Sequence, residues 1–444
     1  MVGPGIVWAA EYIGAGEATM SPRVGALFGV AFLWVLILGI LLKYFIGLGA
    51  GHYTTITGEG MIDMFSRVPG PKNWVVWFVF AVQLCAAMLS PAAIASLAGT
   101  YGRGLLPISP YIWGWMLTII PAILAWTGKY ELIEKAMSVL ILVMVIAVII
   151  GAIMVSPPLR EYFTFSFPSV PTWARGLPDV SERTAMEVLP LLGWGAGGFA
   201  SHVWYTYWIM GKGYGMTANI NYENPGPANA KELKSLGKEK ARKIKSWTRV
   251  VTVDATIALV IGIVVSSCFM IISAGTLHPQ KIVPAGEDIG VEISRIFNIL
   301  FGSWAGYLFI IAILCALFAT QIAHFVGWPR MLSDCLRVGL KRKVDWKKGY
   351  KLFILIMLVL NMVIIYSLGV QPYLLAKAAS IWDGLLFIPL QSAILCYALF
   401  RILPRMLSDE AKPILKPRRS LAAALIVSTM VFSIFAIMML RGII

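Results

Sequence analysis

Two glycine clusters, each inside an otherwise apolar segment, are the residues most suited to chemistry in this chain. Gly14-Ala15-Gly16 is followed directly by Glu17, and Gly195-Ala196-Gly197 lies in the sixth apolar segment. Glycine lowers the cost of leaving helical geometry, and unwound backbone presents carbonyl oxygens that can bind a cation. Glu17 adds a carboxylate, a hard oxygen ligand suited to Mg²⁺ or Ca²⁺. The pattern predicts a cation site between two broken helices.

The composition places both clusters in a membrane. The chain has 444 residues, of which 59% are hydrophobic and 13% are charged, whereas soluble domains are about 45–50% apolar and about 25% charged. A soluble fold of this length cannot cover so much apolar surface. The net charge of +15 therefore does not indicate a nucleic-acid partner. The chain also contains no P-loop, dinucleotide-binding or metalloprotease motif, so we expect neither an enzyme nor a cofactor.

About eleven segments are long and apolar enough to cross a bilayer, which takes about 20 residues each, so the sequence predicts an all-α integral membrane protein. The segments lie near 4–27, 30–52, 73–99, 108–127, 132–156, 185–210, 248–274, 302–327, 350–370, 373–400 and 420–441. The glycine clusters interrupt the first and sixth segments. Two interrupted spans at corresponding positions indicate a transporter built from inverted repeats. The alternative is close helix packing through small residues, but an intramembrane carboxylate such as Glu17 favours a site.

The repeats divide the chain into four parts. We expect the first repeat over residues 1–156, an extracellular loop over 157–183 and the second repeat over 184–403. Residues 404–444 are expected to hold a cytoplasmic connection and the eleventh span.

The basic residues predict the orientation, because connections rich in Lys and Arg stay in the cytoplasm. Residues 211–249 hold nine Lys or Arg, 328–351 hold eight and 401–419 hold six, whereas 157–183 hold three and 276–300 hold two. This places the N-terminus in the cytoplasm and the C-terminus outside the cell. Most of the positive charge then anchors the chain at the inner leaflet, and binding of anionic lipid by a basic connection is the alternative.

Several spaced residues resemble the Nramp family of divalent metal transporters. They are Gly3-Pro4-Gly5 at the start, Lys43 in the second span and Thr57-Gly58-Glu59 after it, together with the number of spans and the position of the break in the sixth. The resemblance covers essentially the whole chain. It implies the LeuT-like fold, with a 5+5 inverted repeat, one extra helix and a metal ion held between the unwound parts of helices 1 and 6.

The chain departs from the family at the residues that the resemblance would make ligands. The family's Asp-Pro-Gly-Asn falls on Gly14-Ala15-Gly16-Glu17, and its Met-Pro-His falls on Phe199-Ala200-Ser201, with Ala196 before it. The site thus lacks the soft methionine sulfur that suits iron-group metals. The acidic pair of the third span is also missing, since that region reads Ala87-Met88-Leu89-Ser90-Pro91-Ala92. These departures resemble the divergent branch that includes magnesium transporters, and they argue against proton coupling.

The resulting candidate metal site combines residues of the breaks with one carboxylate of the tenth span. Glu17 is the first candidate, either as a ligand or as a cap of the second half-helix. Asp383 is the second, either near the ion or paired with Lys377. The complete candidate set is Gly14, Glu17, Ala196, Phe199, His202 and Asp383.

Four further polar residues lie inside spans and leave their roles open. Glu11 faces either a cytoplasmic vestibule or a basic residue at the interface. Gln321 and His324 share a helix face, because they are three residues apart, and a hydrogen bond between helices is favoured over ion contact. Asp254 is an intramembrane acid whose role is either structural pairing or gating.

The sequence thus predicts a secondary transporter that moves a divalent cation across the cell membrane by alternating access. Mg²⁺ or a similar hard cation is favoured and Mn²⁺ stays possible. The expected partners are the ion and the lipid bilayer, and a monomer is favoured. A transporter of the same fold for an organic solute, such as an amino acid, is the alternative.

Overall fold

The structure is a computed structural model that describes residues 3–14, 16–163, 167–177, 179–220, 226–284, 298, 302–340, 345–368 and 372–441. Across these residues the chain is helical and contains no strand. Among them, eight helices are long and apolar enough to cross a membrane, and α6 (Pro110–Trp126) is a shorter apolar helix. Together with the two interrupted helices, these account for all the predicted spans and confirm the all-α membrane fold.

The first part of the chain forms the broken helix 1, four long helices and the short helix α4. In order these are α1 (Pro4–Tyr12), η1 (Gly16–Met20), α2 (Ser21–Phe28), α3 (Leu33–Thr57), α4 (Met61–Phe65), α5 (Trp74–Gly102), α6 and α7 (Tyr130–Val155). Two short 3₁₀ turns follow, η2 (Leu159–Phe163) and η3 (Thr172–Ala174).

The second part begins with the broken helix 6. Its elements are α8 (Thr184–Trp194), α9 (Phe199–Lys212), η4 (Gly215–Asn219), α10 (Ala230–Lys234), α11 (Lys238–Gln280), α13 (Ser303–Leu340), α14 (Trp346–Leu368), α15 (Pro372–Ala379), η6 (Ser380–Leu386), α16 (Ile388–Tyr397), η7 (Ala398–Ile402) and α17 (Leu403–Met406). Then come α18 (Lys412–Leu415) and α19 (Arg419–Arg441). No observation tests the predicted division into two repeats, which stays a prediction.

Two long helices run further than the apolar segments that predicted them. α11 begins ten residues before the predicted position 248, and α13 continues past 327 to Leu340 with Pro329 inside it. The residues added to α11 are largely polar, whereas those added to α13 include buried apolar side chains such as Trp328 and Leu332. The ends of the apolar segments therefore do not mark the ends of these helices. Glycine sets other boundaries: α3 and α9 end at Gly58 and Gly213, whose positive φ angles of 78° and 74° allow a left-handed cap.

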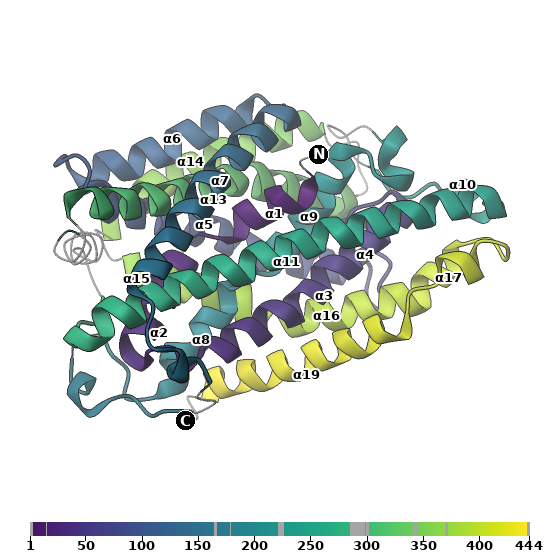
Figure 1. Ribbon diagram of the computed structural model, residues 1–444. Helices are drawn as coiled ribbons and strands as arrows, with labels where there is room; N and C mark the ends of the chain where they lie inside the picture. Colours follow the sequence, from purple (N-terminus) through teal and green to yellow (C-terminus); the bar gives the residue numbers. More distant parts are fainter. Residues whose placement is uncertain are drawn as a thin grey trace.

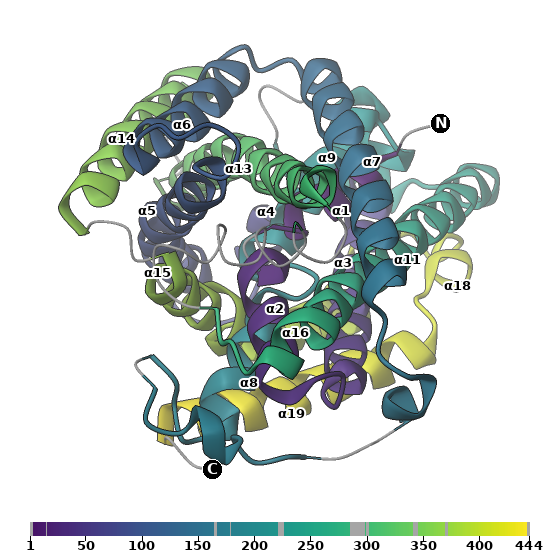
Figure 2. The ribbon, with the colours of Figure 1, turned by 60° about the vertical axis from the view of Figure 1, so that its left-hand side comes forward.

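The broken helices lie at the centre of the bundle. α6 and α14 form one side and α19 the opposite side, with α1 and α2 between them (Figure 2). α1 packs on α7, α9, α11 and α13, and α8 packs on η6. The segments far apart in sequence that carry Glu11, Gly197 and Asp383 are thereby brought to one place.

The two ends of the bundle differ in charge. α10 and α17, which belong to the basic connections, lie at one end, and α2, α8 and α15 lie at the other (Figure 1). We refer to these as the basic end and the opposite end. The basic residues 341–343 lie outside the described residues.

Candidate metal site

The first break separates α1 from η1 around Gly14. Thr320 of α13 donates its hydroxyl to the carbonyl oxygens of Glu11 at 2.8 Å and Ile13 at 3.3 Å. On the other side, the Glu17 carboxylate accepts the Gly14 N–H at 3.1 Å and the Ser266 hydroxyl at 3.0 Å. A Glu that reaches back three residues to an N–H satisfies a donor that the interrupted helix leaves open. Glu17 therefore caps the helix that begins after the first break, and its side chain is fully buried.

The second break lies between α8 and α9. Ala196 and Gly197 have left-handed φ angles of 59° and 81°, which is costly for alanine and easy for glycine. The Lys43 ammonium of α3 compensates by donating to the carbonyl oxygens of Gly193 at 2.6 Å and Gly197 at 2.7 Å. Lys43 is fully buried. A charged side chain thus takes up two of the carbonyl oxygens that unwinding releases.

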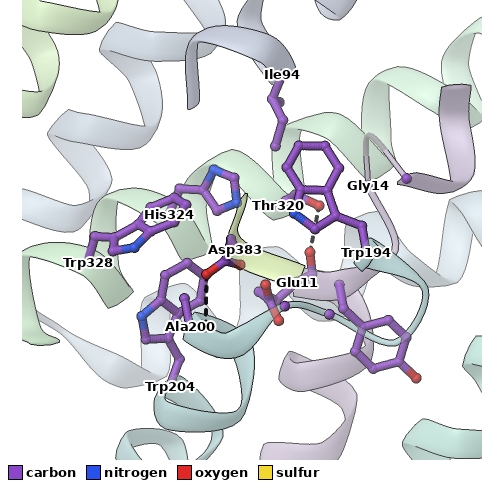
Figure 3. Close-up of a pocket in the computed structure, with 14 residues that line it drawn as sticks. Glu11, Gly14, Ile94, Trp194, Ala200, Trp204, Thr320, His324, Trp328 and Asp383 are labelled. Carbon is purple, nitrogen blue, oxygen red and sulfur yellow. Dashed lines mark hydrogen bonds between the residues drawn. The ribbon is translucent and has the colours of Figure 1, made fainter. Parts of the chain in front are cut away.

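A small cavity, here called the central cavity, lies between the two breaks. About 20 Å³ remains in it for the centre of a water-sized particle, which is room for about one water or one ion. Figure 3 shows the Glu11 and Asp383 side chains projecting into it from α1 and η6. The lining residues are Glu11, Tyr12, Gly14, Gly16, Ile94, Trp194, Gly197, Gly198, Ala200, Trp204, Thr320, His324, Trp328 and Asp383.

The two carboxylates are positioned by hydrogen bonds from the second break and from α5. Ser201 donates to Glu11 and itself accepts the Trp8 indole N–H at 2.9 Å. Asp383 accepts the Gln83 amide at 2.9 Å and the Ala200 N–H at 3.3 Å. These bonds use the Oε2 atom of Glu11 and the Oδ1 atom of Asp383. Glu11 also interacts electrostatically with Asp383, Glu17 and Lys43.

Of the six predicted site residues, Gly14 and Asp383 line the central cavity and the other four lie behind it. Glu17 caps the first break, and Ala196 forms part of the second. His202 contacts Gln391 at 3.0 Å, and Gln391 in turn donates to the Phe199 carbonyl at 2.9 Å. Within the described part of the chain, no three His, Cys, Asp or Glu side chains come together in a metal-binding arrangement. A cation here would also need backbone oxygens and water.

The structure also bears on three alternatives that the sequence leaves open. Lys377 does not pair with Asp383; its ammonium lies 3.8 Å from Glu187. Asp254 accepts the Gly5 N–H at 2.6 Å and the Tyr205 hydroxyl at 3.1 Å, which is the structural pairing; a role in gating stays a prediction. Glu11 faces neither a vestibule nor an interfacial base, since it is only 4% exposed and lines the central cavity.

Gln321 and His324 differ in their surroundings although they share a helix. Gln321 donates to the Pro91 carbonyl at 3.0 Å, which is the predicted bond between helices. His324 lines the central cavity, where it contacts Trp204 and Trp328. Sequence reasoning missed Gln83 altogether, although a single amide within an otherwise apolar third span is a detectable signal.

A substitution at Gly198 is expected to impair transport. A Cβ atom at Gly198 would overlap the Oδ2 atom of Asp383, so Gly198→Ala must displace that carboxylate or the backbone. We expect transport to fall about tenfold or more, measured as ion flux into proteoliposomes. Gly226→Ala is the control, because nothing lies within 4 Å of the place that its Cβ atom would take. Equal flux in both variants would contradict the placement of Asp383 beside the second break.

The family of the chain follows from a comparison with family models. The model described as natural resistance-associated macrophage protein-like, Nramp, matches residues 5–193 and 227–440. The chain belongs to the Nramp family. As a member, it is a multi-pass membrane transporter of a family that carries divalent metals, and it is not an enzyme.

Individual relatives of this Nramp protein are distant. It is 22% identical over 340 residues to the divalent metal cation transporter MntH of Burkholderia ambifaria, covering 76% of this chain and 68% of the relative. It is 20% identical to an uncharacterised protein of Pasteurella multocida, covering 77% and 72%.

Solved structures share the fold of the chain. The Eremococcus coleocola manganese transporter, in complex with an aromatic bis-isothiourea substituted compound, superposes with a TM-score of 0.67 at 14% identity, covering 98% of this chain and 85% of that one. MhsT in complex with L-phenylalanine gives a TM-score of 0.52 at 14% identity, covering 97% and 98%. These matches confirm the predicted LeuT-like fold.

Proposed function

We propose that the chain transports a hard divalent cation, Mg²⁺ in preference to Mn²⁺, by alternating access at the central cavity and without proton coupling. The observation that carries the proposal is the placement of Glu11 and Asp383 in a cavity with room for about one ion. Both come from helices that are interrupted or contain a π-helical turn, where backbone oxygens are accessible. Carboxylate, carbonyl and water oxygens together form a suitable shell for Mg²⁺, which keeps several waters when bound.

The charges around the cavity match a divalent ion. Glu11, Glu17 and Asp383 carry three negative charges when ionised, and Lys43 carries one positive charge, so the buried cluster has a formal charge of −2. Buried charge is costly unless it is neutralised. One divalent cation would neutralise the cluster, whereas a monovalent cation would not.

Within this proposal the predicted residues have distinct roles. Glu11 and Asp383 are direct ligands, and Gly14 contributes backbone oxygen. Glu17 holds the first break and adds charge. Ala196, Phe199 and His202 shape the second break, and His202 supports it through Gln391.

The preference for a hard cation rests on the chemistry of the lining. None of the described residues that line the central cavity is Met or Cys, so soft sulfur ligands are missing there. An organic solute is disfavoured by size, because a space for about one water-sized particle cannot hold even a small amino acid.

The absence of proton coupling is supported by α5. The acidic pair that the family carries in this span is missing from residues 87–92, and the polar group that α5 turns toward Asp383 is the amide of Gln83, which does not titrate. Transport would then be driven by the membrane potential, at about 2.3 kcal/mol per charge per 100 mV. We further propose that the basic end is cytoplasmic, which places the N-terminus inside and the C-terminus outside the cell.

Flux measurements in proteoliposomes test the proposal. We expect Mg²⁺ uptake driven by an inside-negative potential, Mn²⁺ uptake with no advantage over Mg²⁺, and no acceleration by an imposed pH gradient. A lumenal pH indicator should report no proton movement. Flux confined to Mn²⁺, or a matching proton flux, would overturn the hard-cation or the uncoupled part of the proposal respectively.

A further inference from the structure

A second, larger cavity lies near the basic end, far along the bundle from the central cavity. It measures about 440 Å³ and is formed by α3, by α11 and by the segment from α18 into α19. Its polar side carries Lys245, Arg249 and Arg418, and His52 lies among them with its Nε2 atom 2.9 Å from the Thr252 hydroxyl. We call it the basic cavity.

The three cations of the basic cavity repel one another instead of pairing with acids. No ion pair between described residues includes Lys245, Arg249 or Arg418. Arg418 and Arg249 lie close enough to repel the Lys245 ammonium electrostatically. Elsewhere in the same basic connection, by contrast, Lys240 pairs with Glu232 and Lys243 with Glu239. Three converging, mutually repelling cations favour an anion between them.

The other side of the basic cavity is apolar and opens onto a groove. Phe45 and Leu48 of α3 and Leu421 of α19 form its apolar wall. Thr252 and Val253 also line a shallow, largely apolar surface strip of about 350 Å³, here called the groove, whose lining residues all belong to one face of α11 and end at Ile261. This stretch of helix is about 14 Å long at 1.5 Å per residue, roughly the depth of one leaflet of a hydrocarbon core of about 30 Å.

We propose that the basic cavity binds an anionic phospholipid. The phosphate lies among Lys245, Arg249 and Arg418, and an acyl chain follows the groove along α11 past Val260. The long aliphatic stems of Lys and Arg suit this boundary, because they reach from apolar surface to a charged headgroup. A free phosphate or another soluble anion would use the three cations but would leave the adjoining groove without a role.

The position of the lipid connects it to the two breaks. α3 carries Lys43, which holds the second break, and α11 carries Ser266, which contacts Glu17 at the first. A lipid between their ends at the basic end bridges the two helices and stabilises their packing. The bound lipid is therefore expected to raise the thermal stability of the whole protein.

Lipid titration of the full-length protein in neutral detergent tests the proposal. The probes are a phosphatidylglycerol, the matching phosphatidylcholine and glycerol phosphate, with native mass spectrometry and the unfolding temperature as readouts. We expect the phosphatidylglycerol alone to bind and stabilise. Lys245→Gln/Arg249→Gln/Arg418→Gln should weaken binding at least tenfold, since each cation near the surface contributes about fivefold.

Two further variants distinguish a specific binding site from non-specific attraction of the lipid by positive charge. Lys231→Gln/Lys238→Gln/Arg242→Gln removes the same number of positive charges from residues 211–249, which also carry Lys245 and Arg249, but at positions outside the basic cavity. It should bind the phospholipid normally. Val260→Trp fills the groove at a position that is 54% exposed, so it should fold and yet lose phospholipid binding. Equal loss in the control variant, or equally tight binding of glycerol phosphate and phospholipid, would overturn the proposal. So would unchanged binding in Val260→Trp.

Discussion

Glu11→Gln and Asp383→Asn are each expected to lower divalent cation flux at least about 100-fold. A carboxylate about 4 Å from a divalent ion contributes about 8 kcal/mol of attraction at an effective dielectric constant of about 20. If the variant loses only about 2.7 kcal/mol of this attraction in the transition state of transport, the flux falls about 100-fold. Flux into proteoliposomes and cation binding by calorimetry measure the change.

These amide variants should keep the fold. In Glu11→Gln the new amide oxygen would still accept the Ser201 hydroxyl, and in Asp383→Asn it would still accept the Gln83 amide. Glu134→Gln is the control, because Glu134 is a largely buried acid that pairs with Lys212 at 2.9 Å, away from the cavity. Wild-type flux in Glu11→Gln would remove Glu11 from the ion pathway.

Substitutions at Glu17 separate ligation from capping. Glu17→Ala removes both the charge and the cap, and we expect it to abolish transport. In Glu17→Gln the amide oxygen can still accept the Gly14 N–H, so a role in capping predicts partial flux. A complete loss in Glu17→Gln would instead indicate that its charge is required at the ion.

The second large effect is expected at a buried ion pair near the opposite end of the bundle. Arg23 of α2 donates to Glu187 of α8 at 2.6 Å, and both side chains are fully buried. Arg23 also donates to the carbonyl oxygens of Asp179 at 2.5 Å and Pro284 at 3.1 Å, and its guanidinium lies 4.0 Å from the Tyr373 ring centroid. Arg23 and its partners thus join the halves of both broken helices that lie at the opposite end, α2 and α8, to α15 and to two loops.

Glu187→Met should destabilise the fold by about 3–5 kcal/mol, because it leaves the buried Arg23 charge uncompensated. Arg23→Met should cost less, because Lys377 lies 3.8 Å from Glu187 and compensates part of its charge. Arg23→Met and Glu187→Met are the two single variants, and we expect a lower unfolding temperature in each. We also expect faster thiol labelling of Ala18→Cys in either background, because α2 and α8 can then separate and expose this buried position.

The double variant distinguishes the charge pair from simple packing. Arg23→Met/Glu187→Met removes both charges, so it should recover much of the stability that either single change loses. Additive losses in the double variant would show that the two residues act independently and do not form a coupled ion pair.

The sequence predicted the broken helices well because their signal is local. Glycines clustered inside an apolar span lower the cost of unwinding at that point, and both Gly-Ala-Gly clusters coincide with interruptions. Composition likewise identified the intramembrane carboxylates. The sequence did not predict which of these carboxylates line the central cavity.

From the sequence, Glu17 ranked above Glu11 as a ligand, whereas Glu11 lines the central cavity and Glu17 does not. Regular helical spacing cannot assign faces here, because Glu17 lies in the π-helical turn η1 and Asp383 in the π-helical segment η6. A π turn adds a residue and rotates all later side chains relative to an α-helical projection. The bonds from Ser201 and Gln83 cross between helices that are far apart in sequence, so no local pattern reports them.

Each break is held by side chains from the other half of the chain, so the order of synthesis determines when each break is stabilised. Lys43, made early, holds the late second break, whereas Ser266 and Thr320, made late, hold the early first break. The first break therefore enters the membrane before its partners exist. On the proposed function, neither half is expected to complete the ion site alone, because both breaks are supported only when α11 and α13 have been inserted and have packed against α1. Co-expressed halves of this protein should thus acquire their ion site only on assembly.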